Sequence, residues 1–214
     1  MALALDRAGV RAVIFDVDGT LYDQRALRRR MGAALLRRCL ADPKEVGTVR
    51  ILKAFREMRE VLAEEEAEGV AVEQYARPAR RLGVPVERVQ GAVETWINEH
   101  PLAHLPACRF EGLDRLFEGL RRSGRPIAVL SDYPSQAKLA ALGLAADLHV
   151  SALDPDVDRL KPHPKGLLCA VARLGLRPED CLLIGDRDER DGECARRAGV
   201  PYLLKVPRPP AGGV

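Results

Sequence analysis

Two aspartates, Asp16 and Asp18, stand two positions apart directly after the short apolar run 12–15. Ligands of open parallel sheets bind beyond the carboxyl ends of the strands, which is where a strand over this run would put both carboxylates. Such a pair can bind a divalent cation, and one of its members can attack an electrophile. Acidic pairs also form turns and helix caps, so the interpretation depends on what the rest of the chain supplies.

Three later sites supply polar groups in the same kind of position. Ser131 follows the apolar run 126–130, and Lys161 precedes a proline. The segment 185–191 follows the apolar run 181–184 and holds several acidic residues. A hydroxyl donor, a cation and spaced carboxylates at strand ends are the groups that phosphoryl transfer needs.

These positions together carry a resemblance to a known family. The segment 13–20, with its Asp-Val-Asp-Gly-Thr sequence, resembles motif one of the haloacid dehalogenase superfamily of aspartate-based phosphotransferases. Ser131 matches the Ser or Thr of motif two, Lys161 matches the lysine of motif three, and 185–191 matches the spaced-acid form of motif four. All four occur in order. The match is to phosphatases with a helical cap inserted after the first strand, the phosphoglycolate phosphatase-like group.

The resemblance implies Mg²⁺-dependent hydrolysis of a phosphate monoester in two steps. Asp16 attacks phosphorus and forms an aspartyl phosphate. Asp18 donates a proton to the leaving alkoxide and then takes one from the water that hydrolyses the intermediate. Asp18 must therefore hold a proton near neutral pH, and we expect burial and nearby negative charge to raise its pKa.

The same resemblance implies a set of metal ligands. Asp16 would give one carboxylate oxygen to Mg²⁺, Asp18 its backbone carbonyl, and Asp186 its carboxylate. Asp191 would complete the site directly or through water. The spacing within motif four favours Asp191, with Asp188 as the alternative, and a helix N-cap is the structural alternative for either residue.

A second set would bind the phosphoryl group. By the family pattern, Lys161 contacts both the carboxylate of Asp16 and the transferring phosphoryl oxygens, and Ser131 donates its hydroxyl. Backbone N–H groups near Gly19 and Asp132 are expected to add donors, as in anion-binding nests. Gly19 also removes a side chain where the backbone must turn close to the site.

The elements that must position these residues follow from hydrophobic patterning. Five apolar runs, each bounded by Gly, Pro, Asp or Ser, predict strands buried on both faces: 12–15, 126–130, 148–151, 181–184 and 201–204. Helical patterns with a glycine close behind them lie between the later runs: 111–122, 135–142, 166–174 and 189–198. This alternation predicts an α/β fold, a Rossmann-like core of three layers around a parallel sheet.

The chain between the first two strands looks helical throughout, with periodic segments 27–40, 46–68, 72–82 and 86–100. We expect a small all-helical cap domain over 23–104, with about four helices, and a discontinuous core domain formed by 1–22 and 105–214. Tyr22 and Asp23, where the chain leaves the sheet, are candidates for a hinge or for the entrance. The tail 207–214 is rich in Pro and Gly and is expected to be loose.

Composition excludes several classes of protein. The 214 residues carry 34 basic and 31 acidic side chains, for a formal net charge of +3, which is too even to indicate nucleic acid as a partner. The run Arg28, Arg29 and Arg30 is interpreted as a solvated helix face. Five cysteines without a CxxC pair indicate reduced thiols. With no signal pattern and no apolar stretch of about 20 residues, a cytoplasmic protein without a membrane partner is predicted.

A cap that closes over the site predicts a small phosphorylated metabolite as substrate. The state of assembly is left open between a monomer and a homodimer. A sugar-phosphate phosphomutase of the same superfamily is one alternative, because it would carry the same four motifs. A non-catalytic module that binds a phosphorylated ligand is a further alternative. A dehalogenase is disfavoured because such enzymes usually lack the second aspartate, present here as Asp18.

Overall fold

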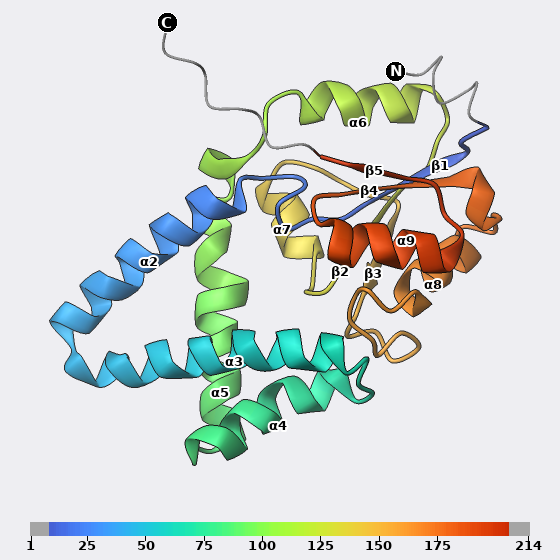
Figure 1. Ribbon diagram of the computed structural model, residues 1–214. Helices are drawn as coiled ribbons and strands as arrows, with labels where there is room; N and C mark the ends of the chain where they lie inside the picture. The colour runs from blue at the N-terminus through green and yellow to red at the C-terminus, as the bar shows by residue number, and fades with distance from the viewer. Residues whose placement is uncertain (1–8, 206–214) are drawn as a thin grey trace, which may run out of the picture.

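The computed structural model describes residues 9–205, so the expected loose tail 207–214 lies outside the described residues. Five strands form one parallel sheet in the order β3-β2-β1-β4-β5 (Figure 1). They are β1 (Ala12–Phe15), β2 (Ile127–Ser131), β3 (Leu148–Ser151), β4 (Cys181–Gly185) and β5 (Tyr202–Leu204). All five predicted strands are confirmed, with ends that differ by one residue at most.

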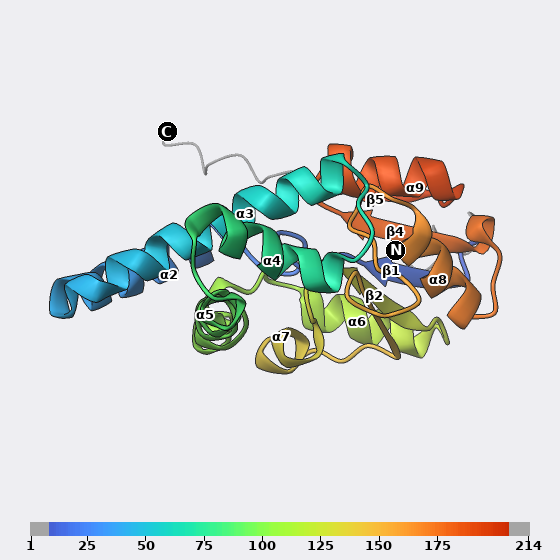
Figure 2. The ribbon, with the colours of Figure 1, turned by 90° about the horizontal axis from the view of Figure 1, so that it is seen from below.

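Helices cover both faces of the sheet, which makes the predicted three layers (Figures 1 and 2). One face carries α6 (Leu113–Arg122) and α7 (Gln136–Ala141), and the other carries α8 (Lys165–Arg173) and α9 (Glu193–Ala198). Along β1, the side chains alternate between the two apolar clusters. Phe15 stacks on Phe117 of α6 with ring centroids 5.0 Å apart, whereas Ile14 packs on the side of α8 and α9. This double burial explains why the strands are continuous apolar runs.

The sheet brings the motif residues to one edge. Phe15 of β1 is in register with Val129 of β2 on one side and with Ile184 of β4 on the other. The three central strands therefore end at nearly the same level, and the residues that follow them meet there. Asp16, directly after β1, donates its backbone N–H to the carbonyl of Ile184 at 2.9 Å.

We call residues 23–104 the helical cap, a segment whose limits as a domain stay a prediction. Its main helices are α2 (Gln24–Ala41), α3 (Val46–Glu64), α4 (Val70–Leu82) and α5 (Val86–Val93). Shorter helical turns are η1 (Pro43–Glu45), η2 (Glu94–Glu99) and η3 (His100–His104), and η4 (Pro106–Cys108) follows the cap. The four predicted helices are present, but the last one changes from α-helix to π-helical turns at residue 94. Figure 1 shows the cap beside the sheet, with α2 extending away from it.

An apolar cluster of its own holds the cap helices together. Ile51 and Phe55 of α3 pack against Ala79 of α4 and Val89 of α5. The ring of Phe55 also stacks on Tyr75, with centroids 5.9 Å apart. The helical periodicity of these segments therefore reflects burial within the cap.

Two connections join the cap to the sheet, and they pair with each other. Tyr22 forms an antiparallel bridge with Arg109, and the N–H of Asp23 donates to the carbonyl of Cys108 at 2.8 Å. The carboxylate of Asp23 also accepts from the N–H of Ala26 at 2.9 Å, as the N-cap of α2. Tyr22 and Asp23 thus lie at the junction where the sequence predicted a hinge.

Candidate active site

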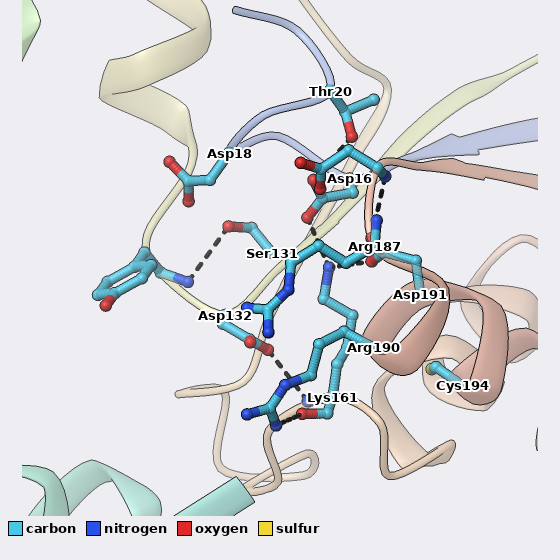
Figure 3. Close-up of polar contacts among 12 residues, drawn as sticks. Asp16, Asp18, Thr20, Ser131, Asp132, Lys161, Arg187, Arg190, Asp191 and Cys194 are labelled. Atoms are coloured by element: carbon cyan, nitrogen blue, oxygen red, sulfur yellow. Dashed lines mark hydrogen bonds and ion pairs between the residues drawn. The ribbon is translucent and has the colours of Figure 1, made fainter. Parts of the chain in front are cut away.

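The centre of the site is the carboxylate of Asp16, which is 5% exposed (Figure 3). The Nζ of Lys161 donates to its Oδ1 at 2.5 Å, and the hydroxyl of Thr20 donates to its Oδ2 at 2.9 Å. The same Nζ lies 2.6 Å from Oδ1 of Asp191. One buried ammonium is therefore shared by two buried carboxylates from different motifs.

The pKa values of Asp16 and Lys161 are both shifted by their surroundings. Burial is the largest influence on Asp16 and, together with the negative charges of Asp191 and Asp18, raises its pKa to about 8 against the opposing effect of Lys161. Burial would lower the pKa of Lys161, but Asp16 and Asp191 outweigh it and raise that pKa well above the ordinary value. A further cation beside Asp16 would favour its ionised, nucleophilic form.

Three carboxylates are placed to hold such a cation. Asp16, Asp186 and Asp191 each offer an oxygen, and these oxygens lie within 4.8 Å of one another. Hard oxygen donors of this kind fit Mg²⁺. Gly19 makes room for the group: its φ is +101°, and a Cβ there would lie 2.1 Å from Oδ2 of Asp186. A side chain at position 19 would therefore displace a candidate ligand.

Within motif four, the geometry favours Asp191 over Asp188. Asp191 is buried, and its Oδ2 accepts from the backbone N–H groups of Asp186 and Arg187, each at 3.1 Å. The side chain of Asp188 is 57% exposed and pairs with Arg196 at 2.9 Å, outside the cluster of carboxylates. The helix predicted from residue 189 begins as the π-helical turn η6 (Asp188–Gly192), and α9 follows it. In this wide turn the side chain of Asp191 reaches back to the loop after β4.

The expectation of a raised pKa for Asp18 is wrong for this structure. Burial acts in the expected direction, but Lys138 outweighs it: its Nζ donates to both carboxylate oxygens, at 2.6 and 2.8 Å. The hydroxyl of Tyr22 donates to Oδ1 of the same carboxylate. These contacts lower the pKa of Asp18, which is therefore ionised here.

The residues predicted to bind phosphate occupy different positions. Asp132 lines the cavity and accepts from the backbone N–H of Lys161 at 3.1 Å through its Oδ1, which ties motif two to motif three. Ser131 ends β2 and is fully buried, and its Oγ accepts from the N–H of Tyr133 at 3.2 Å. Neither Ser131 nor Gly19 lines the cavity.

A cavity of about 450 Å³ lies over these groups, between the edge of the sheet and the helical cap. Its floor comes from the core and includes Asp16, Asp18, Asp132, Tyr133, Lys138, Leu160, Lys161, Asp186, Arg187, Arg190 and Asp191. Its roof comes from the cap and includes Gln24, Leu27, Arg28, Met31, Arg56, Glu57, Arg59, Glu60, Ala63, Trp96, Ile97 and Pro101.

Sequence reasoning missed several of these cationic side chains. Lys138, Arg56 and Arg59 belong to no motif, and nothing in their local sequence distinguishes them from surface residues. Arg190 lies within motif four but was not singled out. The basic run in α2 was interpreted as a solvated face. Its first member, Arg28, lines the cavity, whereas Arg29 and Arg30 do not.

Similar proteins identify the family of the chain. The model of the haloacid dehalogenase-like hydrolase family matches residues 10–199. The chain belongs to this family. A phosphoglycolate phosphatase of Xylella fastidiosa is 26% identical over 208 residues, which cover 92% of this chain and 80% of that protein. A glyceraldehyde 3-phosphate phosphatase of Methanopyrus kandleri is 26% identical over 195 residues, or 89% and 82% of the two chains.

A solved structure of the same family shares the fold. The magnesium-bound HAD-hydrolase YfnB of Bacillus subtilis superposes with a TM-score of 0.63 at 17% identity, covering 91% of this chain and 88% of that one. The predicted family, the α/β fold and the enzyme class, a phosphatase, are confirmed by these matches.

Other predictions stay open or are answered only in part. Within residues 9–205, the helices include none with the length and apolar character needed to span a bilayer. The cytoplasmic location and the choice between monomer and homodimer stay predictions. All five cysteines are free thiols, as expected.

Proposed function

We propose that this hydrolase removes phosphate from a small phosphate monoester with Mg²⁺, through an aspartyl phosphate on Asp16. The observation that carries the proposal is the buried Asp16 carboxylate, held by Lys161 and Thr20 at the carboxyl end of β1. Carboxylates of motif four lie on one side of it, and the carboxylate of Asp18 lines the same cavity.

Asp16, Asp186 and Asp191 are the side chains proposed to hold Mg²⁺, with the carbonyl of Asp18 as the fourth ligand from the chain. The ion would supply positive charge that screens the repulsion between the carboxylate nucleophile and the phosphate anion. Asp16 then attacks phosphorus while Lys161 spreads positive charge over the phosphoryl oxygens. The hydroxyl of Ser131 and the backbone N–H groups near Gly19 and Asp132 are proposed to donate hydrogen bonds to the phosphoryl oxygens.

Asp18 is the proposed acid–base residue, and its contacts divide its two tasks. As an ionised carboxylate it suits the second step, in which it takes a proton from the attacking water. The first step requires a proton on Asp18, and the ion pair between Lys138 and both carboxylate oxygens disfavours that proton. We infer that this contact loosens when the substrate binds.

A small alcohol is the proposed leaving group. The cavity holds about 450 Å³, enough for a metabolite, and residues of the helical cap line one side of it, which disfavours a long chain. The named relatives act on phosphoglycolate and on glyceraldehyde 3-phosphate, both small esters. We infer a small phosphorylated metabolite of the cytoplasm as the substrate.

The decisive test is the Asp16→Asn variant. With Mg²⁺ and a panel of phosphate esters, the wild-type protein should release inorganic phosphate, and the variant should lose at least about a thousandfold in kcat because the nucleophile is gone. Circular dichroism should show an unchanged fold. Isomerised sugar phosphate without free phosphate would identify a phosphomutase, and a wild-type protein inactive on every ester would favour a non-catalytic binding module.

The metal site has a matched pair of variants in motif four. In Asp186→Asn, the Mg²⁺ concentration that gives half-maximal kcat/KM should rise by at least about tenfold, because a direct ligand is lost. Asp188→Asn should leave it unchanged, because Asp188 is exposed and paired with Arg196. The reverse pattern would assign the metal to Asp188.

A further inference from the structure

Two arginines of the roof stand out among the charges that line the cavity. Arg28 of α2 and Arg56 of α3 both line it, yet neither side chain forms a hydrogen bond or an ion pair with any residue of 9–205. They reach the same cavity from two different helices, and both side chains are solvent-accessible.

The other cations of the lining are engaged by protein groups. Lys161 and Lys138 pair with the carboxylates of the floor. Arg190 donates to the carbonyl of Lys161 at 2.7 Å and pairs with Glu60, which also lies 3.7 Å from Arg187. The charges of these side chains are matched by protein groups, and Lys161 is already assigned to the phosphoryl group.

Arg59 is likewise engaged. Its Nη2 donates to the carbonyl of Asp132 at 2.7 Å, its Nη1 donates to Gln74, and its guanidinium lies 4.1 Å from the ring centroid of Tyr133. It joins the cap to the floor, which distinguishes it from Arg28 and Arg56.

The acidic residues of the roof do not neutralise the two arginines. Glu57 pairs with Arg81 at 2.7 Å, and Glu60 faces the floor. Partial desolvation lowers the pKa of Arg56, and the positive charge of Arg28 acts in the same direction, whereas Tyr133 opposes both. Two cations without an acidic partner repel each other, and an anion bound between them would reduce that repulsion.

We propose that Arg28 and Arg56 bind an anionic group on the leaving alcohol, so that the preferred substrate carries a second negative charge besides its phosphoryl group. The inference rests on the proposed function and adds the class of substrate. The phosphoryl group is assigned to the floor, and the second anion to the roof. A carboxylate and a second phosphate share this chemistry, since both accept paired hydrogen bonds from guanidinium.

Two pairs of probes separate these sources. In the first, 2-phosphoglycolate is compared with 2-hydroxyethyl phosphate, which replaces the carboxylate by a neutral group of similar size. In the second, fructose 1,6-bisphosphate is compared with fructose 6-phosphate. Wild-type kcat/KM should favour the anionic member of at least one pair by about tenfold or more, because a charged hydrogen bond is lost in the neutral member. The pair that shows the preference identifies the anion.

Substitution of the arginines tests their role directly. Arg28→Gln and Arg56→Gln should each raise KM for the preferred anionic probe by about tenfold, with kcat changed less than about twofold and no change on the neutral probe. Arg29→Gln, from the same helix but outside the cavity lining, is the matched control and should behave as the wild type. Melting temperatures should be unchanged in all three variants.

Each remaining outcome is decisive. Equal kcat/KM values within both probe pairs, with phosphate release intact, would overturn the anion site and leave the proposed function standing. Equal losses on anionic and neutral probes would overturn it as well. If no probe releases phosphate from the wild-type protein, titration calorimetry with 2-phosphoglycolate and Mg²⁺ gives the answer: weaker binding by Arg56→Gln supports the site, and unchanged binding overturns it.

Discussion

The floor and the roof of the cavity carry their charges differently. On the floor, ammonium groups and carboxylates pair closely, as Lys161 does with Asp16 and Asp191 and Lys138 with Asp18. On the roof, Arg28 and Arg56 have no acidic partner within the described chain. A preorganised floor suits a reaction step that is the same for every phosphate ester, whereas unpaired cations suit the recognition of a particular ester.

The largest effect is expected from breaking the floor at Lys161. In Lys161→Met, two buried carboxylates lose their shared cation, so we expect kcat/KM to fall by at least about a hundredfold and stability to fall by about 3 kcal/mol. Phosphate-release kinetics and denaturant unfolding measure the two losses. Mg²⁺ should recover more stability in this variant than in the wild type, since it would replace the missing charge.

Lys165→Met is the control for that experiment, because Lys165 is exposed and lies outside the cavity lining. It should match the wild type in both measurements. An active Lys161→Met protein would show that the floor does not need its shared cation and would remove the contrast with the roof.

A smaller effect is expected from Lys138, which positions Asp18. In Lys138→Met, the carboxylate of Asp18 keeps only the hydroxyl of Tyr22 as a side-chain partner within residues 9–205, so we expect kcat to fall by about tenfold. The step that uses Asp18 as a base should suffer most, and rapid-quench kinetics should then show phosphoenzyme accumulating. Lys138→Arg should recover part of the rate. A variant with unchanged kcat would mean that the contact plays no part in turnover.

The smallest effect is expected where roof and floor meet. Glu60 of α3 pairs with Arg190 and Arg187 of the core, but its side chain is 54% exposed. We expect Glu60→Gln to raise KM only about twofold at low salt, and the difference should vanish at high salt because exposed pairs are weak and screened. Glu64→Gln, on the same helix and without an acidic or basic partner among residues 9–205, is the control. A large effect independent of salt would show that the pair is essential to the site.

The same contrast explains what could be predicted from the sequence. The strands were predictable because burial on both faces makes them continuous apolar runs, and Asp16, Lys161 and Asp186 follow or flank such elements in recognisable motifs. Lys138 was not predictable, since it lies in an ordinary helix and meets Asp18 only through the fold, 120 positions away along the chain. The lowered pKa of Asp18 follows from that one missed contact.

The roof was harder to predict than the floor. Arg28 belongs to a run of three arginines whose local sequence does not show which member faces a cavity, and the packing of α2 through Leu27 and Met31 decides it. The start of α9 was placed too early because the side chain of Asp191 bonds to the backbone of the preceding loop, and a wide turn precedes the regular helix. Both errors come from long-range contacts that helical periodicity does not contain.

Tyr22 lies in one of the two connections between cap and sheet, and its hydroxyl donates to Asp18. Any rotation of the cap about these connections would change the environment of Asp18, the proposed acid–base residue. Opening the cavity to release product and resetting Asp18 for the next turnover would then be a single event. A substitution at Tyr22 would therefore alter both the junction of cap and sheet and the surroundings of Asp18, whereas a substitution at Arg28 or Arg56 would alter only the lining of the cavity.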